Sequence, residues 1–251
     1  MPQKPIHEHL QAVAEEAKQQ VRASRRPWYH VGKVARILFG LYALLLMLFG
    51  VLAWVVHTSG VLPLDVTITR TLQVDQAPWL RVVMLAISFL GSAWVLWPLI
   101  LLAAVLFWVA GFRLEAITLV LLSAISKGLN VALKVLVARP RPTSHVVRVF
   151  EGASGQSFPS EHVMAFLAFW GLLFCFGLLL FEGKRWWRIL LLVVSAVFIV
   201  LVGPSRVYLG DHWPSDVLGS YLIGAALLGV TLWLYLNLKA RGVLGVRSNE
   251  K

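Results

Sequence analysis

Two histidines in the sequence stand beside residues that can orient them or attract an anion. His212 precedes Asp216 by four residues, close enough for the carboxylate to hold the imidazole at the start of a helix. An oriented imidazole can act as a base or as a nucleophile. His162 follows Ser160, a residue type that caps helices and leaves free backbone N–H groups suited to an anion. The first pattern marks a candidate catalytic residue, and the second marks a candidate anion site.

Basic side chains can supply positive charge to the same anion. A helix that contains Lys134 should end near Ala138, because a proline disfavours the helical conformation of the residue before it. Lys134 then lies on the last turn and Arg141 lies just beyond it, within reach of one anion. Arg206 lies in another polar cluster, six residues before His212. We therefore expect cations from two parts of the sequence at one site.

Lys127 shares a predicted helix face with Asn130 and Lys134. At a helical rise of about 1.5 Å per residue, Lys127 lies about 10 Å deeper in the apolar segment than Lys134. An ionisable residue inside a membrane segment is a candidate functional residue. A structural bridge between helices explains Lys127 equally well.

Taken together, two histidines, one carboxylate and at least three cations provide what phosphoryl transfer requires. The cations stabilise the equatorial oxygens, one histidine can attack in line, and another acid can protonate the leaving oxygen. Each cluster alone has an ordinary structural explanation, such as a helix cap or a histidine–carboxylate pair. Their combination favours phosphoryl chemistry, although the residues themselves do not decide which histidine is the nucleophile.

The composition places these residues in a membrane protein. Of the 251 residues, 59% are hydrophobic and 14% are charged, and the mean hydropathy is +0.76, so a soluble domain could not bury the apolar surface. The formal net charge of +11 does not indicate nucleic-acid binding, because the basic residues cluster between apolar stretches, where they set membrane orientation. We therefore expect an integral membrane protein with no nucleic-acid partner.

The apolar stretches predict an all-α polytopic fold with six transmembrane helices, since about 20 apolar residues cross a bilayer. The expected spans cover residues 34–56, 91–110, 116–137, 163–181, 187–209 and 217–238. Residues 62–90 join the first two spans, and the part after Pro78 predicts either an interfacial helix or an extension of the second span. The expected parts of the chain are a basic N-terminal segment (1–33) with an amphipathic stretch (7–21), a membrane domain (34–240) and a C-terminal tail (241–251).

Basic residues also predict the orientation of the spans. They precede the first span, separate the fourth from the fifth and follow the sixth, which puts both termini in the cytosol. All three polar clusters then lie on the outer or periplasmic face, and the compact size indicates a bacterial plasma membrane. Arg139, Arg141 and Arg148 fall on that outer face against the usual charge bias, so we expect this cluster to reflect function.

In three motifs the sequence resembles the type 2 phosphatidic acid phosphatase superfamily, which includes lipid phosphate phosphatases and bacterial undecaprenyl pyrophosphate phosphatases. The matching residues, in order, are Lys134, Arg141 and Pro142; Pro159, Ser160 and His162; and Ser205, Arg206, His212 and Asp216. The order and spacing of these residues are highly specific, and the six-span layout extends the likeness over nearly the whole chain.

The resemblance implies a role for each motif. His212 attacks phosphorus to form a phosphohistidine, Asp216 orients His212, and His162 protonates the departing lipid oxygen before water releases phosphate. The residues implied in holding the phosphoryl oxygens are Lys134, Arg141, Ser160 and Arg206. Because the cations already supply positive charge, the resemblance implies no metal and no cofactor.

One residue departs from the family pattern. Glu161 stands where the second motif usually has glycine, and its carboxylate brings negative charge close to the phosphate site. The backbone N–H survives the replacement, and the side chain can point away, pair with a neighbouring arginine or interact favourably with the helix N-terminus. We expect Glu161 to alter substrate choice rather than to abolish activity.

The expected substrate is a lipid phosphate or diphosphate whose tail stays in the bilayer. Undecaprenyl pyrophosphate is the first expectation, and phosphatidylglycerol phosphate, phosphatidic acid and lipid A phosphates stay open. A phosphotransferase with the same phosphohistidine differs only in its acceptor, whereas a lipid transporter or scaffold would not need both histidines and Asp216. A soluble haloperoxidase is disfavoured because it would not need six apolar spans. The sequence does not predict the oligomeric state.

Overall fold

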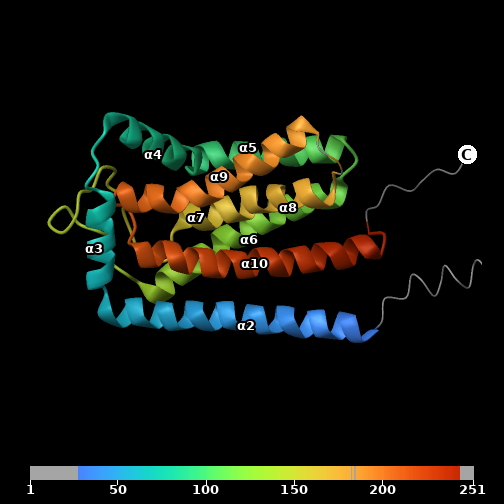
Figure 1. The fold of residues 1–251 in the computed structure, drawn as a ribbon, viewed down its shortest axis with the longest axis horizontal. Coiled ribbons are helices and arrows are strands. Elements are labelled where there is room, and N and C mark those ends of the chain that lie inside the picture. The colour runs from blue at the N-terminus through green and yellow to red at the C-terminus, as the bar shows by residue number, and fades with distance from the viewer. Residues whose placement is uncertain (1–27, 182, 184, 244–251) are drawn as a thin grey trace, which may run out of the picture. The chain divides into compact units, whose positions relative to one another are not determined.

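The structure, a computed structural model, describes residues 28–181, 183 and 185–243, with side chains from residue 39 onward. Every regular element in these residues is a helix (Figure 1). In chain order the helices are α2 (Trp28–Ser59), α3 (Pro63–Leu72), α4 (Pro78–Leu90), α5 (Ala93–Val109), α6 (Arg113–Val137), α7 (Glu161–Phe166), the π-helical turn η1 (Leu167–Gly171), α8 (Leu172–Leu179), α9 (Trp186–Tyr208) and α10 (Pro214–Ala240). The predicted all-α fold is confirmed, while the amphipathic stretch at 7–21 lies outside the described residues.

Among the described residues, five stretches are long and apolar enough to cross a membrane. They are Phe39–Ser59, Arg113–Val137, Glu161–Leu179, Trp186–Tyr208 and Pro214–Ala240. Helices α4 and α5 make a sixth if they form one span that is bent by 58°. In that case α4 is the predicted extension of the second span. The arrangement confirms a multi-pass membrane fold.

The chain divides into two compact units, Met1–Leu44 and Leu45–Lys251, and the second unit holds all the predicted site residues. Its most buried span is the fourth, which α7, η1 and α8 form together. In this span 61% of the most apolar 18-residue stretch is buried, whereas 33% or less of the corresponding stretch is buried in each of the other four spans. Phe166, Leu172 and Phe176 of this span are fully buried. The start of α7 is therefore held by packing around the whole span.

Several loops meet at the end of the bundle where α7 and α10 begin (Figure 1). Gln73, just after α3, donates a hydrogen bond from its side-chain amide to the carbonyl of Arg148 at 2.8 Å. The N–H of Phe150 donates to the carbonyl of Leu209 at 2.9 Å. The long loop between α6 and α7 is thus tied both to α3 and to the turn between α9 and α10.

Candidate active site

The three polar clusters predicted from the sequence meet at this end of the second unit. They lie at the end of α6 with the loop that follows, at the start of α7, and at the turn between α9 and α10. Arg141 of the first cluster lies beside His212 of the third, with Arg141 Nη1 3.3 Å from His212 Nε2. Glu161 of the second cluster lies 3.7 Å from Lys134 of the first. The fold therefore assembles one site from segments far apart in the sequence.

Asp216 lies behind the His212 imidazole and is held from several sides. His212 Nδ1 is 3.5 Å from Asp216 Oδ2, and both side chains are buried. The same oxygen accepts hydrogen bonds from the Trp213 N–H at 2.8 Å and from the Ser157 hydroxyl, while Arg139 Nη1 lies 2.5 Å from Oδ1. These contacts fix the carboxylate beside the imidazole.

The surroundings of His212 determine its protonation. Burial lowers the pKa of His212 to about 4, although Asp216 acts in the opposite direction. The imidazole is therefore neutral near pH 7 and carries one proton. Arg141 approaches Nε2, and arginine can only donate hydrogen bonds, so Nε2 has the lone pair. The proton is therefore on Nδ1, the nitrogen that faces Asp216. An unprotonated nitrogen thus faces a cation.

We expect His212 to stay neutral throughout the physiological pH range. In an NMR titration of the protein with labelled imidazoles in detergent, its resonance should titrate near pH 4, because burial disfavours the charged form. The resonance is identified as the one that is missing from the His212→Asn spectrum. A midpoint at the ordinary value of 6.5 would contradict the prediction.

Arg206 is buried and is held by groups from three segments. Its Nη2 lies 2.6 Å from Asp211 Oδ2, and its Nη1 donates to the Ser88 hydroxyl and lies 3.3 Å from Glu151 Oε2. Burial raises the pKa of the Asp211 carboxyl to about 6, although Arg206 acts in the opposite direction. Within the described residues, Arg206 Nε has no hydrogen-bond partner. The guanidinium is thus fixed in position with one donor unsatisfied.

Ser160 is the residue before α7, as expected of a helix cap, but its hydroxyl forms no capping hydrogen bond. Its N–H donates to Ser220 Oγ at 2.7 Å. Its own Oγ is buried and has no partner in the described part of the chain. A buried hydroxyl without a partner is costly, so this oxygen is available to a ligand. Ser160 therefore occupies the predicted capping position, but its side chain does not form the capping hydrogen bond.

His162 packs against the bend between α4 and α5. A side chain at Gly91 would overlap Cδ2 of the imidazole, so only glycine leaves room for the ring in this position. The positive charges of Arg206 and Lys134 are near enough to act on His162. The second histidine therefore borders the same site as the first.

The Glu161 carboxylate is paired with cations. Lys127 Nζ donates a hydrogen bond to Glu161 Oε1, and Lys134 Nζ lies 3.7 Å from Oε2. Pairing with an arginine was one expectation, whereas the actual partners are two lysines of α6. Lys127 thus links α6 to α7, which agrees with the explanation of this residue as a structural bridge between helices.

Two buried residues near the site, Arg139 and Asp65, were not among the predicted catalytic or phosphate-binding residues, although Arg139 belonged to the positive cluster expected to reflect function. Arg139 Nη2 lies 2.6 Å from Asp65 Oδ2, and Arg139 Nη1 lies 2.5 Å from Asp216 Oδ1. Asp65 Oδ1 also accepts a hydrogen bond from the N–H of Ser215 at 2.9 Å. Asp65 lies in the first turn of α3 and is 150 residues from Ser215, so no local pattern connects them. For Arg139, the signal in the sequence was its positive charge on the face predicted to lie outside.

Positive charge at the site comes from lysine and arginine. Lys134, Arg141 and Arg206 approach it from α6, from the loop after α6 and from α9. Among the residues that the structure describes, no three His, Cys, Asp or Glu side chains gather closely enough to hold a metal ion. The described donor set therefore favours binding of an anion.

Comparisons with known proteins point to one family. Residues 115–240 match the family described as the PAP2 superfamily. Phosphatidylglycerophosphatase B of Bacillus subtilis is 32% identical over 73% of this chain and 89% of its own length. The undecaprenyl-diphosphatase of Sulfolobus acidocaldarius is 29% identical over 73% of this chain and 86% of its own length. The structure also resembles the crystal structure of a transmembrane PAP2-type phosphatidylglycerolphosphate phosphatase from Bacillus subtilis, with a TM-score of 0.67 and 28% sequence identity. The match covers 78% of this chain and 96% of that chain.

These matches confirm the resemblance that the three motifs indicated. The matched region contains every predicted site residue, from Lys134 to Asp216. The structural likeness extends over most of the chain, including spans outside that region. The chain therefore belongs to the PAP2 superfamily and is a multi-pass membrane lipid phosphatase.

Proposed function

We propose that this phosphatase hydrolyses its lipid substrate through a phosphohistidine on His212. The observation that carries the proposal is the position of His212 Nε2, which has a free lone pair and lies 3.3 Å from Arg141. Asp216 lies 3.5 Å from the opposite nitrogen of the ring. A nucleophile, a cation for the phosphoryl oxygens and a carboxylate to balance the imidazole therefore lie together.

In the first step, His212 Nε2 attacks phosphorus and the bond between phosphorus and the lipid oxygen breaks. His162 donates a proton to that oxygen, so the lipid leaves as an alcohol or, from a diphosphate, as a lipid monophosphate. The positive charge on the phosphorylated imidazole is balanced by Asp216. Four side chains are proposed to hold the phosphoryl oxygens during transfer: Lys134, Arg141, Ser160 and Arg206. The unpaired Ser160 Oγ supports this assignment.

In the second step, water attacks the phosphohistidine. His162, now deprotonated, takes a proton from that water, and the bond between phosphorus and nitrogen breaks. Inorganic phosphate leaves and His212 returns to its neutral form. The lysine and arginine side chains provide the charge stabilisation, so we propose that neither step requires a metal or a cofactor.

The substrate is proposed to reach the site from the outer leaflet of a bacterial plasma membrane. The basic residues between spans support this orientation, with residues 1–33 and 241–251 in the cytosol and residues 34–240 as the membrane domain. The names of the relatives support two lipids, phosphatidylglycerol phosphate and undecaprenyl pyrophosphate. Phosphatidic acid is a third candidate of the same chemical class.

Phosphate release in excess EDTA tests the proposal. The purified chain is supplied in detergent with each of the three lipids, and we expect release from at least one lipid at the same rate with and without EDTA. Activity that EDTA abolishes and a divalent cation restores would contradict the metal-free mechanism. Transfer of phosphate to an added alcohol in place of water would instead identify a phosphotransferase.

A further inference from the structure

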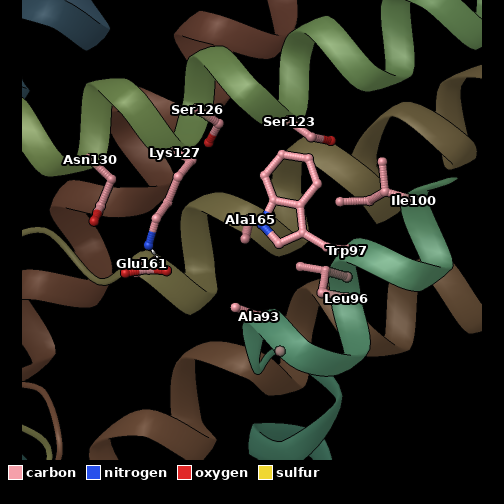
Figure 2. Close-up of a pocket in the computed structure, with 11 residues that line it drawn as sticks. Ala93, Leu96, Trp97, Ile100, Ser123, Ser126, Lys127, Asn130, Glu161 and Ala165 are labelled. Atoms are coloured by element: carbon pink, nitrogen blue, oxygen red, sulfur yellow. Dashed lines mark hydrogen bonds and ion pairs between the residues drawn. The ribbon is translucent and has the colours of Figure 1, made fainter.

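A small cavity lies between α5, α6 and the start of α7, next to the proposed active site (Figure 2). Apolar side chains of α5, such as Trp97, line one side of it, and Lys127, Asn130 and Glu161 line the other. Figure 2 shows Lys127 extending from α6 toward Glu161 at the start of α7. The cavity therefore has a polar end beside the second motif.

This cavity adjoins His162, the residue proposed to protonate the leaving group. Gly91 lines it and also provides the space that the His162 ring fills, and His162 is the proposed acid for the leaving oxygen. A separate cavity of about 510 Å³ lies beside Arg141, the residue next to His212 Nε2. In-line displacement puts the nucleophile and the leaving group on opposite sides of phosphorus. The smaller cavity is thus placed to receive the atoms just beyond the leaving oxygen.

The polar end of the cavity offers hydrogen-bond acceptors. Asn130 is buried, and its amide nitrogen is fixed by a hydrogen bond to the carbonyl of Pro159 at 3.0 Å. Its Oδ1 has no partner among the described residues. Glu161 adds a carboxylate, which can only accept when ionised. A hydroxyl can donate to these oxygens, whereas an ionised phosphate has no proton to donate.

Charge and size both oppose a second phosphate at this place. Glu161 already engages Lys127, the lysine beside this cavity that a second phosphate would need. A second phosphate would also lie close to the Glu161 carboxylate, and charges of like sign repel strongly where water is scarce. The free space is about 30 Å³, which holds two or three water-sized groups at roughly 10–15 Å³ each.

We propose that this cavity is a leaving-group subsite for a hydroxyl-bearing carbon and that Glu161 is the residue that selects phosphate monoesters over diphosphates. The proposal rests on the phosphatase activity proposed above and names its substrate class. Glu161 acts as an internal anion that occupies Lys127 in place of a second phosphate. Beyond its leaving oxygen, phosphatidylglycerol phosphate presents carbon and a hydroxyl group, and these match the acceptors and the volume.

Substrate preference in a set of variants tests this assignment. We compare kcat/KM for phosphatidylglycerol phosphate and for undecaprenyl pyrophosphate in the wild type, Glu161→Gln, Lys127→Met and the double variant. The wild type should favour the monoester by at least about tenfold, and Glu161→Gln should reduce that ratio by at least about tenfold through faster diphosphate hydrolysis. The double variant should lose the gain, because the lysine that Glu161 releases is then absent.

A matched control comes from the far end of the bundle, where Glu115 pairs with Lys239 at 2.7 Å. Glu115→Gln removes a similar carboxylate and should leave the substrate ratio unchanged. Either a wild type that prefers the diphosphate or an unchanged ratio in a folded Glu161→Gln variant would overturn the selectivity proposal and leave the phosphatase mechanism intact. Failure of the wild type to release phosphate from any lipid would overturn the proposed function and the subsite together.

Discussion

Replacement of His212 by alanine should reduce phosphate release from every lipid substrate by on the order of 10⁴-fold or more, which is the usual consequence of removing an enzyme nucleophile. The reason lies in the placement of Nε2, which has the free lone pair and lies 3.3 Å from Arg141. The loss should appear in kcat and in kcat/KM alike, because this nitrogen forms its bond only during reaction. Release of phosphate from each lipid over hours is the measurement.

The same variant should also fail to form a covalent intermediate. With a substrate labelled in its phosphate, rapid quenching in base should trap label on the wild type, since phosphohistidine survives alkali and is lost in acid. The His212→Ala protein should trap none. Label that persists in this variant would show that another residue is the nucleophile, and His162 would be the first to examine.

His162→Ala distinguishes the proposed acid from the proposed nucleophile. This variant lacks the proton donor for the leaving oxygen, so it should hydrolyse lipids about 10²–10⁴-fold more slowly. A substrate with a nitrophenolate leaving group needs no proton at that step and should still phosphorylate His212. Equal impairment on both kinds of substrate would contradict the assignment of His162 as the acid.

His145→Ala is the matched control for both histidine variants. His145 is exposed in the loop between α6 and α7 and lines the outer cavity beside Arg141, but in the described structure its side chain forms no hydrogen bond or ion pair with the proposed site residues. Its replacement should change the rate by less than about threefold, in line with the small effects of surface substitutions. A large loss would indicate that the loop itself is required.

The transmembrane spans could be predicted because the hydropathy of a stretch and the effect of a proline on the backbone depend only on nearby residues. The third and fifth expected spans, 116–137 and 187–209, differ from the helices Arg113–Val137 and Trp186–Tyr208 by a few residues at most. The local spacing of His212 and Asp216 likewise produces their contact, because α10 begins between them. Periodic and short-range signals are therefore sufficient for the helices and for this pair.

Long-range pairing of side chains could not be predicted in the same way. Glu161 was recognised as an unusual charge, but its partner Lys127 lies 34 residues away, on a helix whose rotation no local pattern defines. The bond between Asp65 and Ser215 joins residues 150 apart. Short-range patterns contain no information about such distances, so the buried network around the active site became visible only in the folded structure.

That buried network leads to the second large expected effect. Arg139→Met should lower the free energy of unfolding by about 3–5 kcal/mol, because it leaves two buried carboxylates without their cation. The Arg139 side chain has no exposed surface, and it lies 2.6 Å from Asp65 and 2.5 Å from Asp216. It also donates from Nε to the carbonyl of Gly60 at 2.8 Å. Chemical unfolding in mixed micelles provides the measurement.

Arg148→Met is a suitable control, because Arg148 lies in the same loop with an exposed side chain. It should alter the free energy of unfolding by no more than about 0.5 kcal/mol. A loss below about 1 kcal/mol in Arg139→Met would contradict the prediction and would mean that the two carboxylates find other partners or take up protons.

Asp65→Asn combined with Arg139→Met separates the stability of this network from its effect on catalysis. Removing one of the two carboxylates relieves part of the uncompensated charge, so the double variant should be more stable than Arg139→Met alone. In the double variant Asp216 Oδ1 still lacks its contact with Arg139. We therefore expect kcat to remain below the wild-type value even though stability recovers. Recovery of both quantities together would mean that Arg139 serves the fold alone. Recovery of stability alone would identify Arg139 as a positioning residue, acting on His212 through Asp216.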